Sequence, residues 1–166
     1  MADEEDILVQ YLRRSYHAVD GLWFLQVEGT QGFERALEMD RRVWEGLAKI
    51  QARKARELVG CAGNGADVLA RCFSLKLTAD GHQFDLATGA GAIRFIITGC
   101  PWLELLRKSN GENLASQIAL AICATEGRVW CAEFGGEYEF TIPAMKCAGN
   151  EHCEMRFARK GRGGGC

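Results

Sequence analysis

The feature that most constrains the fold is a change in hydrophobic period after Gly60. Before it, apolar residues recur every three to four positions along two long stretches, residues 4–28 and 33–59, which are separated by a glycine turn. After it, in residues 73–78, apolar and polar residues alternate one by one. The pattern predicts two long N-terminal helices followed by antiparallel strands, an α/β (α+β) fold.

The rest of the chain extends this prediction. Glycine-containing turns at 79–81 and 89–91 separate short alternating segments, which is typical of antiparallel strands. We expect a three-stranded meander at residues 73–78, 83–86 and 93–97, followed by a short helix at 103–108. A long central helix at 112–134 and a C-terminal β-hairpin at 138–157 complete the chain. These elements form one domain, residues 1–160, followed by a Gly-rich tail, 161–166, which we expect to be disordered.

Composition restricts the function. A formal net charge of -2 gives no general attraction to nucleic acid or anionic lipid. No apolar run reaches the roughly 18 to 20 residues of a membrane span, and the acidic start is unlike a secretory signal. We therefore expect a cytoplasmic protein with no nucleic-acid partner and no membrane span. Its eight cysteines are then expected to be thiols or metal ligands rather than disulfides.

Four of these cysteines carry the chemistry of the predicted site. Cys100 follows a predicted strand, Cys123 lies on the central helix, and Cys147 and Cys153 lie on the closing hairpin. If these elements pack together, the thiols converge as ligands for a soft divalent metal ion, with zinc preferred and iron as the alternative. The other interpretation is that each buried cysteine acts as a small hydrophobe.

Two carboxylates are candidate catalytic groups. Glu126 follows Cys123 by one helical turn, so it could be a fourth ligand or a general base beside a metal-bound water. It could equally be a surface charge paired with an arginine. Asp20 lies beside aromatic positions of the first helix and could be a base or ligand contact, or could cap the second half of a broken helix. Cys100, at the start of a helix, is a further candidate nucleophile, although no histidine pair accompanies it.

A second group of residues indicates a ligand pocket. By angular count, Tyr16 shares a helix flank with Asp20 and Trp23, while Asp40 falls inside the apolar stripe of the second helix. A polar group on such a face must find a partner or face a cavity. The predicted ligand-binding residues of an apolar aromatic pocket are Tyr16, Trp23, Asp40, Trp44, Trp102 and Trp130.

The order of these features resembles a known family. Two N-terminal helices, the Cys-Pro-Trp junction at 100–102, a helix with Cys123, Glu126 and Trp130, and the 147–153 hairpin resemble the vinyl-4-reductase-like domain superfamily. Within it, the chain is most similar to small proteins described as L-2-amino-thiazoline-4-carboxylic acid hydrolase-like. The resemblance covers about residues 11–157.

The resemblance implies a fold shared with TRAPP vesicle-tethering subunits, often dimeric, with a pocket for a small apolar or cyclic ligand between sheet and helices. It also implies a metal ion held by Cys100, Cys123, Cys147 and Cys153. The leading hypothesis is a small-molecule or metal-binding domain, expected to be a homodimer. The alternative is a metal-dependent hydrolase that opens a cyclic C=N bond, and a third class is a structural adaptor.

Overall fold

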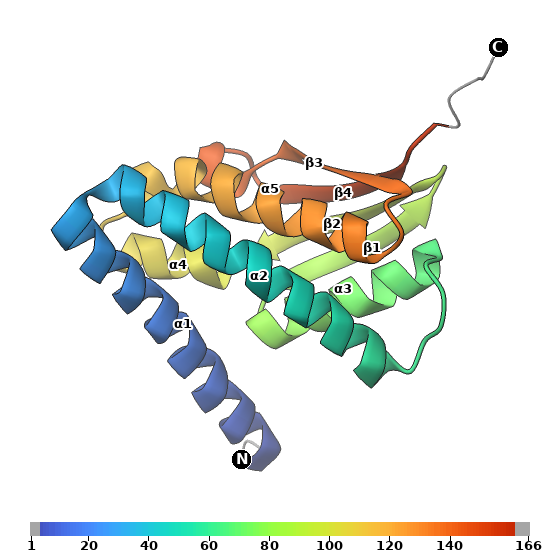
Figure 1. Cartoon of the computed structure of the whole chain (residues 1–166), viewed down its shortest axis with the longest axis horizontal. Coiled ribbons are helices and arrows are strands. Elements are labelled where there is room, and N and C mark those ends of the chain that lie inside the picture. Colours follow the sequence, from blue (N-terminus) through green and yellow to red (C-terminus); the bar gives the residue numbers. More distant parts are fainter. Residues whose placement is uncertain (1–3, 162–166) are drawn as a thin grey trace.

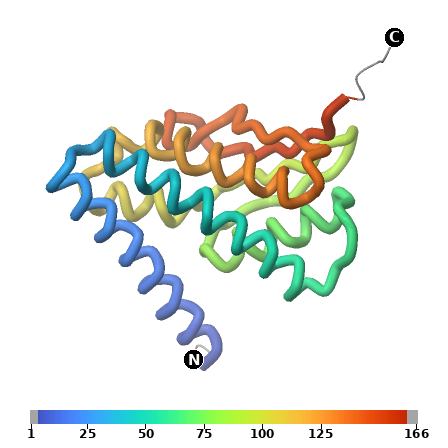
Figure 2. Tube along the Cα trace, in the orientation of Figure 1, coloured from blue at the N-terminus to red at the C-terminus, as the bar shows by residue number. Residues whose placement is uncertain are grey.

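The computed structural model describes residues 4–161 and contains two long helices that precede a helix-covered sheet (Figures 1 and 2). The predicted tail, 161–166, lies almost wholly outside the described residues. The helices are α1 (Glu4–Gln31), α2 (Phe33–Val59), α3 (Ala66–Asp80), α4 (Pro101–Lys108) and α5 (Ala115–Glu133), with short 3-10 turns η1 (Glu112–Leu114) and η2 (Lys146–Ala148). The strands are β1 (Gln83–Gly89), β2 (Ala92–Gly99), β3 (Tyr138–Ala144) and β4 (Cys153–Arg159).

The four strands form one antiparallel sheet in the order β1-β2-β4-β3. In its centre, Phe95 of β2 lies opposite Met155 of β4, and Ile93 lies opposite Phe157. Because side chains alternate between faces, these apolar residues share one face of the sheet. Helices α2, α3 and α5 cover that face (Figure 1), so the sheet is apolar on one side only.

One predicted strand is wrong. Residues 73–78 belong to helix α3, so β1 and β2 make a two-stranded hairpin rather than a three-stranded meander. The buried residues Leu69, Phe73 and Leu77 recur every four positions, whereas Leu75 is 37% exposed. Six alternating residues are compatible with either period. The helix places Phe73 and Leu77 on the same buried face as Leu69 and turns Leu75 away from it, whereas a strand would have placed Leu75 with Phe73 and Leu77.

Other boundaries agree with the sequence. Helix α2 spans the predicted residues, and Pro101 begins α4, as expected for a first-turn proline. Strand β3 extends to Ala144 instead of ending at Pro143, with an irregular register between Thr141 and Ala144. A proline is tolerated there because β3 is an edge strand.

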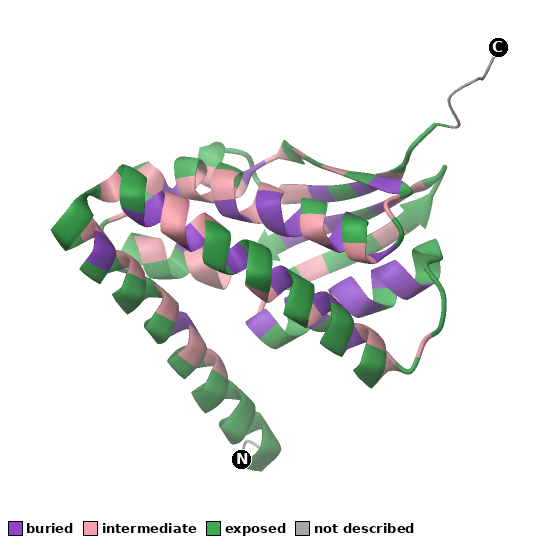
Figure 3. Cartoon of the chain, in the orientation of Figure 1, coloured by how far each residue is buried: buried purple, intermediate pink, exposed green. Residues whose placement is uncertain are grey.

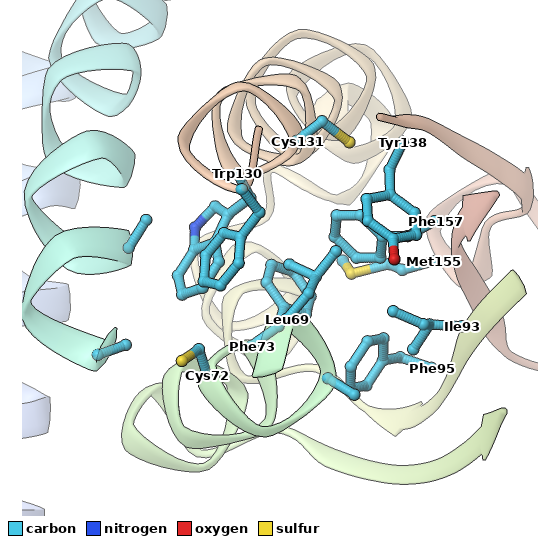
Figure 4. Packing of buried hydrophobic residues seen from close by; sticks show 14 of the residues in the cluster. Leu69, Cys72, Phe73, Ile93, Phe95, Trp130, Cys131, Tyr138, Met155 and Phe157 are labelled. Carbon is cyan, nitrogen blue, oxygen red and sulfur yellow. The ribbon is translucent and has the colours of Figure 1, made fainter. Parts of the chain in front are cut away.

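Among residues 4–161, buried apolar side chains form two clusters. Figure 3 shows where the chain is buried, and Figure 4 shows part of the larger cluster. The larger cluster packs α3 and α5 on the sheet, and Phe73 contacts Phe95, Phe157 and Trp130 with ring centroids 4.9 to 5.0 Å apart. The smaller cluster joins α2 and α5 around Trp44 and includes rings from α1 and α4. The candidate site described next contacts this smaller cluster.

Candidate functional site

A buried ion-pair network connects α3 and α5. The Nζ atom of Lys76 lies 2.7 Å from Oε1 of Glu126 and 3.1 Å from Oδ2 of Asp80, and all three side chains are at most 5% exposed. Lys76 and Asp80 are one turn apart on α3, so the helix itself places them on the same face. Burial alone would lower the pKa of Lys76, but the two carboxylates outweigh it and raise that pKa. The lysine is therefore a cation at neutral pH.

Glu126 and Asp80 together place two carboxylates against this single cation. Burial raises the pKa of Glu126, and Lys76 opposes that shift. Removing charges from water is expensive, and such networks are weak sources of net stability compared with an apolar replacement. The surplus acidic group makes this region a candidate for function rather than for stability alone.

Helix α1 brings further polar groups to the network. Arg13 anchors the helix, because its guanidinium donates to the carbonyl oxygens of Ala79 and Thr78 at 2.7 and 3.0 Å. One turn later, the hydroxyl of Tyr16 and Nε2 of His17 are buried without a hydrogen-bond partner among the described residues.

The phenol of Tyr16 and the imidazoles of His17 and His82 are neutral at neutral pH. Burial raises the pKa of Tyr16, and Asp80 adds to the shift. Burial lowers the pKa of His17. Burial also lowers the pKa of His82 to about 4, and the positive charge of Lys76 adds to that shift. Nδ1 of His82 is also buried, and no residue in the described part of the chain forms a hydrogen bond with it. Neutral imidazoles and a neutral phenol can each donate or accept one hydrogen bond to a bound molecule.

Asp20 and Asp40 form the other side of the site. The indole Nε1 of Trp44 donates to Oδ1 of Asp20 at 3.1 Å, and α1 runs unbroken through this position, so Asp20 does not cap a helix. Burial raises the pKa of Asp20 to about 6, with Trp44 opposing the shift. Burial, together with Asp20, raises the pKa of Asp40 to about 7. Asp40 is 4% exposed, and its Oδ1 has no hydrogen-bond partner within residues 4–161.

Four rings line the same region and are called here the aromatic cluster: Tyr16, His17, Trp44 and Trp102. Trp102, from α4, lies 4.2 Å from His17, 5.7 Å from Tyr16 and 5.4 Å from Trp44 between ring centroids. The last two contacts are edge-to-face, a geometry that aromatic pairs favour. Rings from three helices thus meet beside the unpartnered polar atoms.

The structure brings together four of the six predicted ligand-binding residues: Tyr16, Asp40, Trp44 and Trp102. Trp23 lies apart, on the outer side of α1, and is 51% exposed. Trp130 is completely buried in the larger cluster, where it stacks on Phe134 at 5.8 Å. Asp20 joins the aromatic side of the site and Glu126 joins the ion-pair network.

The four predicted metal ligands gather at the end of the sheet where β2 ends and β4 begins. Cys100 follows β2, Cys153 begins β4, Cys147 lies in η2, and Cys123 faces them from α5. The backbone N–H of Lys146 donates to the sulfur of Cys153 at 3.1 Å. Within residues 4–161, however, no three His, Cys, Asp or Glu side chains have a geometry that would hold a metal ion.

The thiols influence one another through space. Burial raises the pKa of Cys100 and of Cys123, and it raises the pKa of Cys147 to about 11. Cys153 adds to each of these shifts, and Glu126 adds to that of Cys123. Cys123 and Glu126 thereby connect the four cysteines to the ion-pair network.

Sequence reasoning missed Lys76, Asp80, His17 and His82. The strand assigned to residues 73–78 turned Lys76 outward and placed Asp80 in a turn, so neither was a candidate. A helical interpretation would have found them, because an i, i+4 pair of opposite charge on the apolar side of a helix indicates a buried ion pair. His17 had a weaker signal, its position beside Tyr16.

A shallow surface hollow of about 260 Å³ lies elsewhere in the molecule. Its lining includes Ala66, Ile93, Tyr138 and Arg159, around the tip of the β1–β2 hairpin. None of its lining residues belongs to the aromatic cluster, to the ion-pair network or to the four predicted metal-ligand cysteines. We therefore assign the candidate site to the buried polar and aromatic residues.

The fold is similar to that of a domain of known structure. The chain is similar to the crystal structure of the phenol-responsive sensory domain of the transcription activator PoxR with phenol. The TM-score is 0.51 at 14% identity, over 86% of this chain and 73% of that chain. At this identity the similarity concerns the fold alone.

The chain belongs to DUF6125, a family of unknown function whose model matches residues 2–110. The matched region includes the aromatic cluster, Lys76 and Asp80, but ends before Glu126. No protein of curated function matches the sequence. Within residues 4–161, none of the helices combines the length and apolar character needed to cross a bilayer.

Proposed function

We propose that the protein is a small-molecule-binding domain whose ligand lies between the aromatic cluster and the ion-pair network. The observation that carries the proposal is the set of buried, unpartnered polar atoms there, on Tyr16, His17, Asp40 and His82. Each such atom costs roughly 1 to 3 kcal/mol when it is left without a hydrogen bond. A ligand that supplies the missing bonds recovers this free energy on binding.

The chemistry of the site favours a small ring compound with a hydrogen-bonding group. Trp44 and Trp102 offer aromatic surface, while Tyr16 and His17 offer neutral donors and acceptors. The structural neighbour is described as phenol-responsive, and its fold is similar to that of this chain. We also infer that this chain belongs with the vinyl-4-reductase-like superfamily, on the basis of its helix order and its Cys-Pro-Trp junction.

Isothermal titration with phenol tests this proposal. Tyr16→Phe removes one buried hydroxyl and is expected to weaken binding by about tenfold, equivalent to roughly 1.4 kcal/mol for one hydrogen bond. Tyr11→Phe is the matched control, because Tyr11 lies on the same helix and is 69% exposed. Titration with cyclohexanol, which lacks the aromatic ring, measures what the ring contributes to affinity. Titration with aniline, which has an amine in place of the hydroxyl, measures what the hydroxyl contributes. Equal affinities for wild type, Tyr16→Phe and Trp102→Ala would argue against this site.

We further propose that Cys100, Cys123, Cys147 and Cys153 bind a soft divalent metal ion, zinc in preference to iron. The donor set fits, since thiolates are preferred ligands of both ions. Burial raises the pKa of Cys123 and of Cys147, which keeps these two thiols protonated in the absence of a cation, so metal binding would release protons and would become stronger as the pH rises. The ion would stabilise the contact between α5 and the end of the sheet.

Metal content of protein purified without an affinity tag tests this second proposal. Cys123→Ser is expected to lose one equivalent of metal and to lower the melting temperature. Cys131→Ser is the matched control, because Cys131 lies on the same helix but contributes to none of the pKa shifts of the other thiols. Metal-free wild type, with no zinc uptake on titration, would contradict the proposal.

A second candidate function, metal-dependent hydrolysis of a cyclic C=N bond, is favoured by the proximity of Glu126 to Cys123. Glu126 would act as general base, for which it would have to exchange Lys76 for a metal-bound water. Turnover of a thiazoline carboxylate that Glu126→Gln abolishes with metal content unchanged would support it. No turnover by metal-loaded wild type would leave binding as the function.

A further inference from the structure

Two carboxyl groups of the site, on Asp20 and Asp40, lack a cationic partner. Asp40 is 4% exposed and Asp20 is half-buried. Within residues 4–161, neither of them forms an ion pair with a basic side chain. Asp20 adds to the raised pKa of Asp40, so the two groups lie close enough to repel each other. Because a buried carboxylate without a counter-charge is costly, the pair favours a cation that the chain itself does not supply.

The rest of the site does not correct this imbalance of charge. The ion-pair network contains one cation, Lys76, which is already shared by Asp80 and Glu126. The guanidinium of Arg13 donates instead to backbone carbonyl oxygens of α3. The site therefore has four carboxyl groups to one lysine, and an excess of acidic groups favours a positively charged ligand.

Two groups that are not carboxyls also lack partners beside this pair. The hydroxyl of Tyr16 and Nε2 of His17 are buried with no hydrogen bond to any residue of the described chain, and His17 is 7% exposed. Asp20 raises the pKa of Tyr16, as do Asp80 and Glu126, so the hydroxyl lies near both groups of acids. A hydroxyl oxygen and a neutral imidazole nitrogen can each accept a hydrogen bond from an ammonium group.

The aromatic cluster favours an organic cation. The indole N–H of Trp44 donates to Asp20 at 3.1 Å, and the Trp44 ring lies 6.2 Å from Tyr16 and 5.4 Å from Trp102 between centroids. The faces of such rings attract ammonium groups. An ammonium group also carries three N–H donors, and Asp20, Asp40 and Tyr16 offer the same number of acceptor groups. A ligand with both a ring and an ammonium group thus matches every component of the site.

We propose that the ring compound of the proposed function, on which this inference rests, is a protonated arylalkylamine. Its ammonium group is held by Asp20, Asp40 and the hydroxyl of Tyr16, and its ring packs on Trp44 and Trp102. Binding supplies the counter-charge and the missing hydrogen bonds together. A neutral alcohol supplies only the hydrogen bonds, and a carboxylate adds a further negative charge. For ligands with the same ring, affinity therefore decreases in the order amine, alcohol, carboxylate.

Isothermal titration with 2-phenylethylamine, 2-phenylethanol and phenylacetate tests the charge of the ligand, because the three compounds share one ring and one chain length. The amine is expected to bind at least about tenfold more tightly than the alcohol, as for a hydrogen bond to a charged group. Asp40→Asn is expected to lower this ratio of affinities by about tenfold. Asp85→Asn is the matched control and keeps the ratio, since Asp85 lies exposed on β1. Circular dichroism verifies that both variants are folded.

The pH dependence of binding gives a second measurement, which needs no variant. The pKa is raised to about 6 for Asp20 and to about 7 for Asp40, so the free protein holds protons that the ammonium group must displace. An aliphatic ammonium group keeps its own proton to about pH 10. Affinity for the amine is therefore expected to rise by about tenfold or more between about pH 6 and pH 8, whereas affinity for the alcohol changes by less than about threefold.

The other titratable groups that face the site do not produce this profile. The imidazoles and the phenol are neutral over this range, Arg13 and Lys76 stay charged, and the remaining carboxyls are paired with Lys76. These groups are Arg13, Tyr16, His17, Lys76, Asp80, His82 and Glu126.

The outcomes separate this inference from the proposed function. Amine affinity that does not exceed alcohol affinity, or that is flat with pH, overturns the ammonium site. If phenol then still binds and Tyr16→Phe weakens it, the proposed function stands without this inference. If neither phenol nor any of the three phenylethyl compounds binds, both are overturned.

Discussion

At the scale of single residues, Lys76 is the group on which the buried polar network depends. It is the partner of both Asp80 and Glu126, and its removal leaves two carboxylates buried without a counter-charge. We expect Lys76→Met to lower the free energy of unfolding by about 3 to 5 kcal/mol, the range measured when one partner of a buried pair is removed. Urea denaturation measures the loss.

The matched experiment replaces the whole network. Lys76→Met combined with Asp80→Asn and Glu126→Gln removes all three charges and is expected to recover most of the stability, since no charge is then left uncompensated. If the triple variant is as unstable as the single one, packing rather than charge accounts for the loss.

Asp40 predicts a particular dependence of stability on pH. Its pKa is raised to about 7 in the folded protein, so the folded state holds a proton that the unfolded chain releases near pH 4. The free energy of unfolding therefore falls as pH rises from about 4 to 7 and levels off above 7, by up to a few kcal/mol. Thermal or urea unfolding as a function of pH measures this slope.

Asp40→Asn should flatten that slope, because the amide does not ionise. Asp85→Asn is the control, since Asp85 lies exposed on β1. A wild-type profile that rises steadily from pH 4 to 7 would mean that ion-pair carboxylates dominate and that Asp40 is ionised in the fold.

At the scale of elements, the contact of α5 with β3 depends on Gly127. A Cβ at this position would overlap the Phe140 ring, which lies directly against the helix backbone. Gly127→Ala is expected to destabilise the protein by about 1 to 3 kcal/mol through overpacking, despite the better helix propensity of alanine. Gly46→Ala provides the comparison, because Gly46 lies in α2 with open space around it, and a gain of about 0.5 to 1 kcal/mol is expected. Denaturant unfolding of the pair measures both.

The elements also show how far the sequence could predict the fold. Long stretches with a sustained period, such as α2, were predicted with their observed bounds. Residues 73–78 were not, because six residues carry too little periodicity to distinguish a strand from a helix whose buried positions are four apart. That single error hid Lys76 and Asp80. Cys100, Cys123 and Cys153 were assigned to places in the chain that the structure contains, whereas their role as metal ligands stays a prediction.

At the scale of the whole molecule, the proposed ligand site joins three helices. Tyr16 and His17 of α1 meet Trp44 of α2 and Trp102 of α4. A ligand that binds only the folded state stabilises that state by mass action. We expect saturating phenol to raise the free energy of unfolding, by about 2.7 kcal/mol when its concentration is about 100 times the dissociation constant.

Urea unfolding with and without phenol measures this gain. Tyr16→Phe should show a smaller gain at the same phenol concentration, because its dissociation constant is higher. Tyr11→Phe should behave as wild type, since Tyr11 is 69% exposed. An equal gain in all three proteins would mean that phenol binds outside the aromatic cluster.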